Sequence, residues 1–143
     1  EKQSLFERLN CTVVYRCSVN QCKVNKIQEY LTRDRDTIIS FNGGGNFGDL
    51  YREEVKTKMD SILHFTNQRI VLFPQSVYYR SNQRMKLDAL HMSRHRDLHL
   101  MARSEDSFSI LKENFAKHHS YYFLPDMAFM IGPITPMCEP VYD

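Results

Sequence analysis

Three consecutive glycines give the strongest chemical signal in the sequence. Gly43, Gly45 and Gly48 satisfy the pattern G-x-G-x-x-G between a predicted strand and a predicted helix. Glycines let the backbone approach an anion closely, and the free N–H groups at the start of the next helix can then bind it. Two interpretations stay open: the segment binds a phosphate or carboxylate, or it is a tight turn with close helix–strand packing.

The residues around this segment argue against a dinucleotide site. Asp49 follows the last glycine, where it is expected to cap the next helix, and its carboxylate would repel a pyrophosphate. Gln75 and Ser76 stand after the next strand, where a carboxylate for a ribose is expected. No G-K-[ST] follows the glycines, which excludes a Walker A loop.

Polar side chains follow the strand predicted over residues 69–73. Gln75 and Ser76 can hydrogen-bond a sugar or a phosphate, and Tyr78 can stack on a sugar. The alternative is a plain polar strand end.

Charged side chains follow the later strands. Arg103 can bind a phosphate or carboxylate through two parallel hydrogen bonds, or it can form an ion pair with Glu105 or Asp106. Asp126 places a carboxylate at the last strand end, where it can equally form a turn.

Histidines and cysteines give no strong metal signal. His91, His95 and His99 are spaced four apart, but the predicted strand at 98–102 breaks the helix that would align them, so solvated histidines are expected. Cys17 and Cys22 can form a disulfide in an oxidising compartment or remain thiols. We therefore expect no metal.

The elements that must position these groups alternate between helix and strand. Apolar spacing predicts helices over 1–9, 27–31, the residues after Asp49 through 63, 82–93 and 107–116. Short β-rich runs predict strands over 12–15, 37–41, 69–73 (ended by Pro74), 98–102 and 121–124, with a turn or strand over 127–131. This order predicts an α/β fold with a parallel sheet in a three-layer sandwich, whose ligands bind at the carboxyl ends of the strands.

Length and composition fit one globular domain over residues 1–132, with residues 133–143 leaving it. The chain has 143 residues, 42% hydrophobic and 25% charged. A net charge of +2 gives no reason to expect a nucleic-acid partner. Apolar runs are too short to cross a membrane.

Four segments together resemble the polysaccharide pyruvyl transferases. They are GGGNFGDLY at 43–51, RIVLFPQS at 69–76, RSEDS at 103–107 and PDMA at 125–128, and the likeness covers roughly residues 10–132. The resemblance implies transfer of the enolpyruvyl group of phosphoenolpyruvate to a sugar, forming a pyruvate ketal on a glycan or lipid-linked oligosaccharide. It needs no other cofactor. The fold it implies is Rossmann-like, one half of a two-domain transferase of the GT-B type.

The resemblance also implies which residues bind substrate. These are Gly43, Gly44, Gly45, Asn46, Gly48, Asp49, Gln75, Ser76, Tyr78 and Arg103. Family members often have His where this sequence has Tyr78, and Trp where it has Tyr51, so no catalytic acid or base is assigned.

We further expect the chain to be the N-terminal half of such an enzyme. By this comparison the first strand is missing before Glu1, residues 133–143 lead to a missing second domain, and the sheet has an unpaired edge that favours self-association. The chain alone is then not expected to catalyse. Two alternatives are a non-catalytic glycan- or anion-binding module and a nucleotide-binding Rossmann domain. A glycan pathway in the secretory system or at the cytoplasmic face is compatible with the family.

Overall fold

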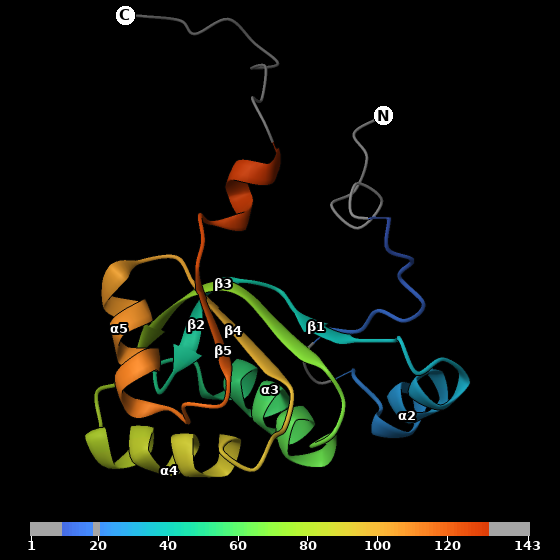
Figure 1. Ribbon diagram of the computed structural model, residues 1–143, viewed down its shortest axis with the longest axis horizontal. Coiled ribbons are helices and arrows are strands. Elements are labelled where there is room, and N and C mark those ends of the chain that lie inside the picture. Colours follow the sequence, from blue (N-terminus) through green and yellow to red (C-terminus); the bar gives the residue numbers. More distant parts are fainter. Residues whose placement is uncertain (1–9, 19–20, 132–143) are drawn as a thin grey trace, which may run out of the picture.

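A parallel β-sheet flanked by helices forms the centre of the molecule (Figure 1). The computed structural model describes residues 10–18 and 21–131. The strands are β1 (Ile39–Phe41), β2 (Gly44–Gly48), β3 (Ile70–Tyr78), β4 (Leu98–Ala102) and β5 (Ser120–Phe123). The helices are α2 (Val24–Arg33), α3 (Arg52–His64), α4 (Asn82–Met92), α5 (Glu105–Asn114) and the 3₁₀ helix η1 (Met127–Ile131).

The sheet order is β1-β3-β4-β5, and every pair of strands is parallel. β1 pairs with the first half of β3, and β2 pairs with its second half, so β1 and β2 lie along the same side of β3. The α/β, Rossmann-like fold class predicted from the sequence is confirmed.

The core lies on the face of the sheet covered by helices. Ile70 and Leu72 of β3 and Leu98 and Leu100 of β4 are at most 1% exposed, while the residues between them are half-buried. Each such side chain stabilises the fold by about 1.5–3 kcal/mol on burial. This period-two pattern gives one strongly apolar face of β3 and β4, against which α5 packs, while α3 packs against β2.

Two helices begin as their capping residues dictate. The Ser81 hydroxyl accepts a hydrogen bond from the backbone N–H of Arg84, and the Ser104 hydroxyl accepts one from Ser107. The helix predicted over 82–93 is confirmed, and the one predicted over 107–116 begins two residues earlier than expected because Ser104 caps it.

Two local predictions are wrong, and the tight turn considered for the glycine segment is not formed. Thr12–Tyr15 forms no strand, because within the described residues it pairs with no other strand, and backbone N–H and C=O groups define a strand only through such pairing. Pro74 does not end its strand: the register of β3 against β4 shifts between Leu72 and Gln75, and a bulge at this point tolerates the missing N–H. The glycine segment is strand β2, not a turn.

Cys17 and Cys22 are joined by a disulfide just before α2, with Cα atoms 5.1 Å apart. Of the two alternatives that the sequence left open, the structure has the bridge. The predicted helix over 1–9 and the segment 133–143 lie outside the described residues.

Candidate functional site

The glycines in and just before β2 have different physical roles. A Cβ on Gly43 would lie 2.1 Å from the carbonyl oxygen of Pro74, and one on Gly48 would lie 1.7 Å from that of Tyr78. Gly48 also has φ +131°, a conformation that other residues rarely adopt. Close packing therefore explains these two glycines, although the neighbour is strand β3 and not a helix. Gly45, in contrast, is exposed.

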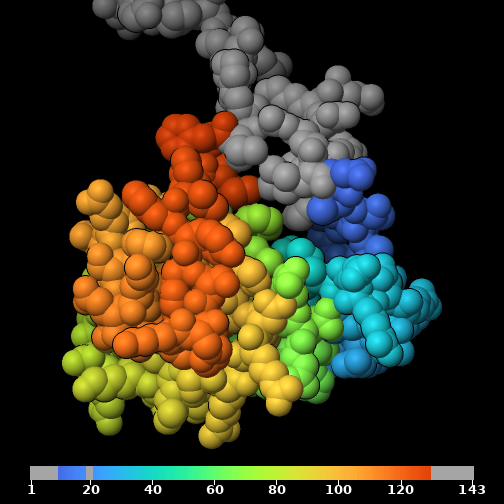
Figure 2. Space-filling model, viewed as in Figure 1, coloured from blue at the N-terminus to red at the C-terminus, as the bar shows by residue number. Residues whose placement is uncertain are grey.

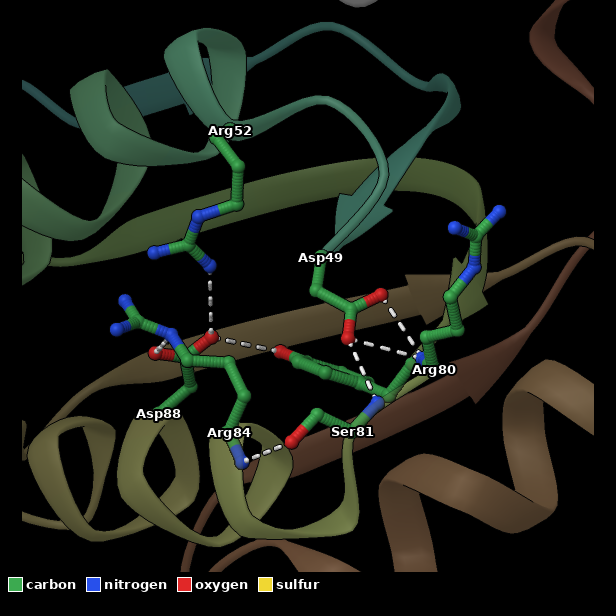
Figure 3. A network of polar contacts seen from close by, with 7 residues as sticks. Asp49, Arg52, Arg80, Ser81, Arg84 and Asp88 are labelled. Atoms are coloured by element: carbon green, nitrogen blue, oxygen red, sulfur yellow. Dashed lines mark hydrogen bonds and ion pairs between the residues drawn. The ribbon is translucent and has the colours of Figure 1, made fainter.

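The side chain of Asp49, directly after β2, contacts the backbone at the start of α4 (Figure 3). Its carboxylate accepts hydrogen bonds from the backbone N–H groups of Arg80 at 2.8 and 2.9 Å and Ser81 at 2.8 Å. These bonds, first that of Arg80, lower the pKa of the Asp49 carboxyl. The prediction that Asp49 caps the next helix is wrong, because the N-cap of α3 is Tyr51.

A second carboxylate, Asp88, lies fully buried near this junction. Arg84 Nε lies 3.0 Å from one Asp88 oxygen, Arg52 Nη1 lies 4.0 Å from the other, and the Tyr79 hydroxyl donates to the latter at 3.3 Å. Figure 3 shows both arginines directed at Asp88. These residues come from α3, α4 and the end of β3, so the cluster links these three elements. The two arginines compensate the negative charge of Asp88.

The most unusual buried group is the ammonium of Lys58 on α3, which is 3% exposed. Lys58 Nζ donates to Asn46 Oδ1 at 2.7 Å and to Gln75 Oε1 at 3.1 Å. Burial lowers the pKa of Lys58 to about 8, and Glu54 opposes this effect. Lys58 therefore brings a cation to Asn46 and Gln75, two of the residues predicted to bind substrate.

Arg103, directly after β4, contacts the same segment of β3. Its Nε donates to Ser76 Oγ at 2.9 Å, and its Nη1 forms an ion pair with Asp126. Its partner is thus Asp126 and neither of the two adjacent acids that the sequence suggested. A Cβ on Gly45 would lie 3.5 Å from Arg103 Nη2, and within the described ranges Nη2 has no hydrogen-bond partner.

Asp126 combines the two roles left open by the sequence. One oxygen pairs with Arg103, and the other accepts a hydrogen bond from the backbone N–H of Ala128 at 2.8 Å. The Ala128 bond and then Arg103 hold the pKa of this carboxyl below its usual range. Asp126 thereby fixes the guanidinium next to Gly45.

A cavity of about 1020 Å³ reaches this region beside β1. Residues 11–18, α2, β1 and α3 supply most of its wall, and Gly43, Asn46 and Lys58 also line it. Tyr15 and Tyr30, also in the wall, stack with ring centroids 5.7 Å apart. The space therefore combines aromatic side chains with hydrogen-bond donors, which suits a sugar or a small anion.

The predicted site residues are thus brought together only in part. Asn46 and Gln75 meet at Lys58, and Gly45 and Ser76 meet at Arg103. Tyr78 lies at the end of β3 and is 49% exposed. Gln75, Ser76 and Tyr78 belong to strand β3 and not to a loop after it.

The histidines are not all solvated as predicted. His95 is 1% exposed, and its Nδ1 accepts a hydrogen bond from the backbone N–H of Asp97 at 3.2 Å. In the part of the chain that the structure describes, no group of three or more His, Cys, Asp or Glu side chains is arranged to hold a metal ion. No helix there is long and apolar enough to span a membrane.

Comparison with known proteins gives a family match. The family model described as "Polysaccharide pyruvyl transferase" matches residues 8–136. "Putative pyruvyl transferase EpsO" of Bacillus subtilis (strain 168) is 36% identical over 107 residues, covering 75% of this chain and 33% of that protein. "Pyruvyl transferase 1" of Schizosaccharomyces pombe (strain 972 / ATCC 24843) is 28% identical over 142 residues, covering 96% of this chain and 35% of that protein. The chain spans about a third of the length of these curated relatives.

Proposed function

The chain belongs to the polysaccharide pyruvyl transferase family, and from this premise we propose that it supplies part of the donor site for transfer of the enolpyruvyl group of phosphoenolpyruvate to a glycan. Because the chain spans about a third of the relatives' length, the proposal assigns it one part of the enzyme's site. A glycan or lipid-linked oligosaccharide is the proposed acceptor.

One observation carries the proposal: two cations flank adjacent residues of β3 beside the glycine strand. Lys58 binds Gln75, and Arg103 binds Ser76. Phosphoenolpyruvate carries a phosphate and a carboxylate, and such anions are held by charge-assisted N–H donors. Arg103 Nη2 has hydrogen atoms left to donate next to exposed Gly45, where an anion has room to approach.

The reaction itself explains why such donors are needed. Protonation of the methylene carbon of phosphoenolpyruvate makes its C2 oxocarbenium-like, and a sugar hydroxyl adds there and loses its proton. Phosphate then leaves, and a second hydroxyl adds to C2 and loses its proton, so that the products are a cyclic pyruvate ketal and inorganic phosphate. Fixed cations stabilise the phosphate as negative charge gathers on it. We assign no acid or base to this chain.

Calorimetric titration with phosphoenolpyruvate tests the proposal, using the longest form of the protein that can be purified. We expect saturable binding that Arg103→Ala weakens by about tenfold or more, because a charge-assisted donor is lost. Arg69→Ala is the matched control, since it removes another Arg–Asp ion pair, with Asp97 at 2.9 Å, just before β3. This control is expected to bind normally.

The alternative outcome is equally clear. No saturable binding, or equal weakening by Arg103→Ala and Arg69→Ala, would overturn the donor-site proposal. Binding of a glycan without phosphoenolpyruvate would then favour a non-catalytic glycan-binding module.

A further inference from the structure

Within the described residues the buried ammonium group of Lys58 forms no ion pair with a carboxylate, although the more distant Glu54 raises its pKa. Among residues 10–18 and 21–131, its hydrogen-bond partners are the amide oxygens of Asn46 and Gln75. Taking a charge out of water without an opposite charge costs free energy. A hydrophobic residue would suit the apolar stripe formed by Val55, Met59 and Ile62 better, so the lysine calls for a role beyond packing.

An ammonium group orients any amide that it binds. It donates three hydrogen bonds and accepts none, so the amide oxygen must face it and the amide NH₂ must face away. Asn46 Oδ1 is held by Lys58 at 2.7 Å, and Asn46 is half-buried in the wall of the cavity. In the described structure Asn46 Nδ2 has no partner, so its two hydrogen atoms are left to donate.

Lys58 orients the side-chain amide of Gln75 in the same way as that of Asn46. Its side chain is 1% exposed, its Oε1 accepts from Lys58 at 3.1 Å, and its Nε2 is buried without a hydrogen-bond partner. A buried donor without a partner lowers the stability of the fold. One lysine therefore fixes two amides whose N–H groups remain unused in the absence of a ligand.

We propose that Lys58 is a positioning residue of the donor site: it holds the amide oxygens of Asn46 and Gln75, so that Asn46 Nδ2–H donates to a phosphate or carboxylate oxygen of phosphoenolpyruvate. The inference rests on the proposed function. Without the ammonium group, the Asn46 amide is free to rotate by half a turn and present its oxygen to the anion, which repels it.

The surroundings make this arrangement sensitive to pH. The groups that β2 and β3 direct at Lys58, the amides of Asn46 and Gln75, are uncharged. The charged residues that line the same cavity are Arg16, Asp34, Asp36 and Glu54. Because burial lowers the pKa of Lys58 to about 8, the affinity for phosphoenolpyruvate should fall above that pH in the wild-type chain. In Lys58→Arg, which stays protonated, this alkaline fall should disappear.

A double-mutant cycle tests whether Lys58 acts through Asn46. At neutral pH we expect Lys58→Met and Asn46→Ala each to raise the Kd for phosphoenolpyruvate by about tenfold, and the double variant to bind no more weakly than Asn46→Ala alone. Lys58→Arg should recover most of the affinity. Losses that multiply to about a hundredfold, or unchanged binding in Lys58→Met, would overturn the proposal.

A second readout separates this inference from the proposed function. In ¹⁵N NMR spectra of the full chain, the side-chain amide resonances of Asn46 and Gln75 should shift with an apparent pKa of about 8 and should stay fixed in Lys58→Met. Absence of this titration in the wild type overturns the contact itself. Titration without any binding of phosphoenolpyruvate leaves the contact standing and overturns its assignment to a donor site.

Discussion

At the scale of single residues, His119 is an imidazole that the fold keeps neutral. It is 5% exposed, and the interaction of its ring with the Met92 backbone does not offset the burial. Burial, followed by the neighbouring His118 and His95, lowers the pKa of His119 from 6.5 to about 4. Protonation of His119 is therefore easier in the unfolded chain than in the folded one.

The sign of the resulting pH dependence follows directly. Between pH 6.5 and about 4 the unfolded state binds a proton at His119 that the folded state does not, so the free energy of unfolding falls as the pH falls through this window. We expect His119→Phe to reduce this acid-induced loss, because the variant has no imidazole to protonate. Urea unfolding of both proteins at several pH values measures it. Parallel curves for the two proteins would contradict the expectation.

Residues differ in how far the sequence reveals their role. Asn46, Gln75, Ser76 and Arg103 were identified because polar side chains follow predicted strands or stand among glycines. Lys58 was missed, although a signal exists: it lies three residues after Val55 and one before Met59, inside an apolar stripe. The sequence alone does not decide whether this ammonium group is buried, because a lysine in such a stripe often extends its ammonium to water. Only tertiary packing prevents this.

At the scale of elements, β2 exists because β3 continues beyond Pro74. The glycine segment has few side chains to define a strand, and its ladder forms only against residues 75–78. Local propensity predicts a turn there and the end of a strand at the proline. Pairing of the glycine segment with residues 75–78, some thirty residues later in the chain, overrides both local preferences. For this reason the fold class and the later helices and strands could be predicted, whereas the geometry of the glycine strand could not.

The close approach of β2 to β3 gives a prediction at this scale. Gly48→Ala should destabilise the fold by at least about 2 kcal/mol, because the new Cβ would meet the Tyr78 carbonyl oxygen at 1.7 Å and φ is +131°. Gly45→Ala is the matched control in the same strand, since its Cβ would lie 3.5 Å from Arg103, an ordinary contact. Urea unfolding compares them. Equal losses of stability in the two variants would contradict the role of strand packing.

At the scale of the whole molecule, both edges of the sheet are open within the described residues. β1 pairs only with β3, and β5 pairs only with β4. Apolar side chains follow the β5 edge: Phe123 is 51% exposed, Leu124 40% and Phe129 78%. In Figure 2 the segment from β5 to η1 (red-orange) lies at the front of the molecule, and no other described segment overlies it there. An open strand edge beside exposed aromatic rings favours pairing with a second chain.

We therefore expect this chain by itself to self-associate as its concentration rises. Replacing both Phe123 and Phe129 by Ser should lower the associated fraction severalfold, because exposed apolar surface beside the open β5 edge is removed and neither residue belongs to the buried core. Leu90→Ser is the control. Leu90 is apolar and exposed too, at 59%, but it lies on α4, away from a strand edge. Light scattering over a range of concentrations measures the effect. A monodisperse monomer at every concentration would show that the open edges do not pair. An equal decrease of the associated fraction in Leu90→Ser would show that exposed apolar area alone, and not the β5 edge, drives the association.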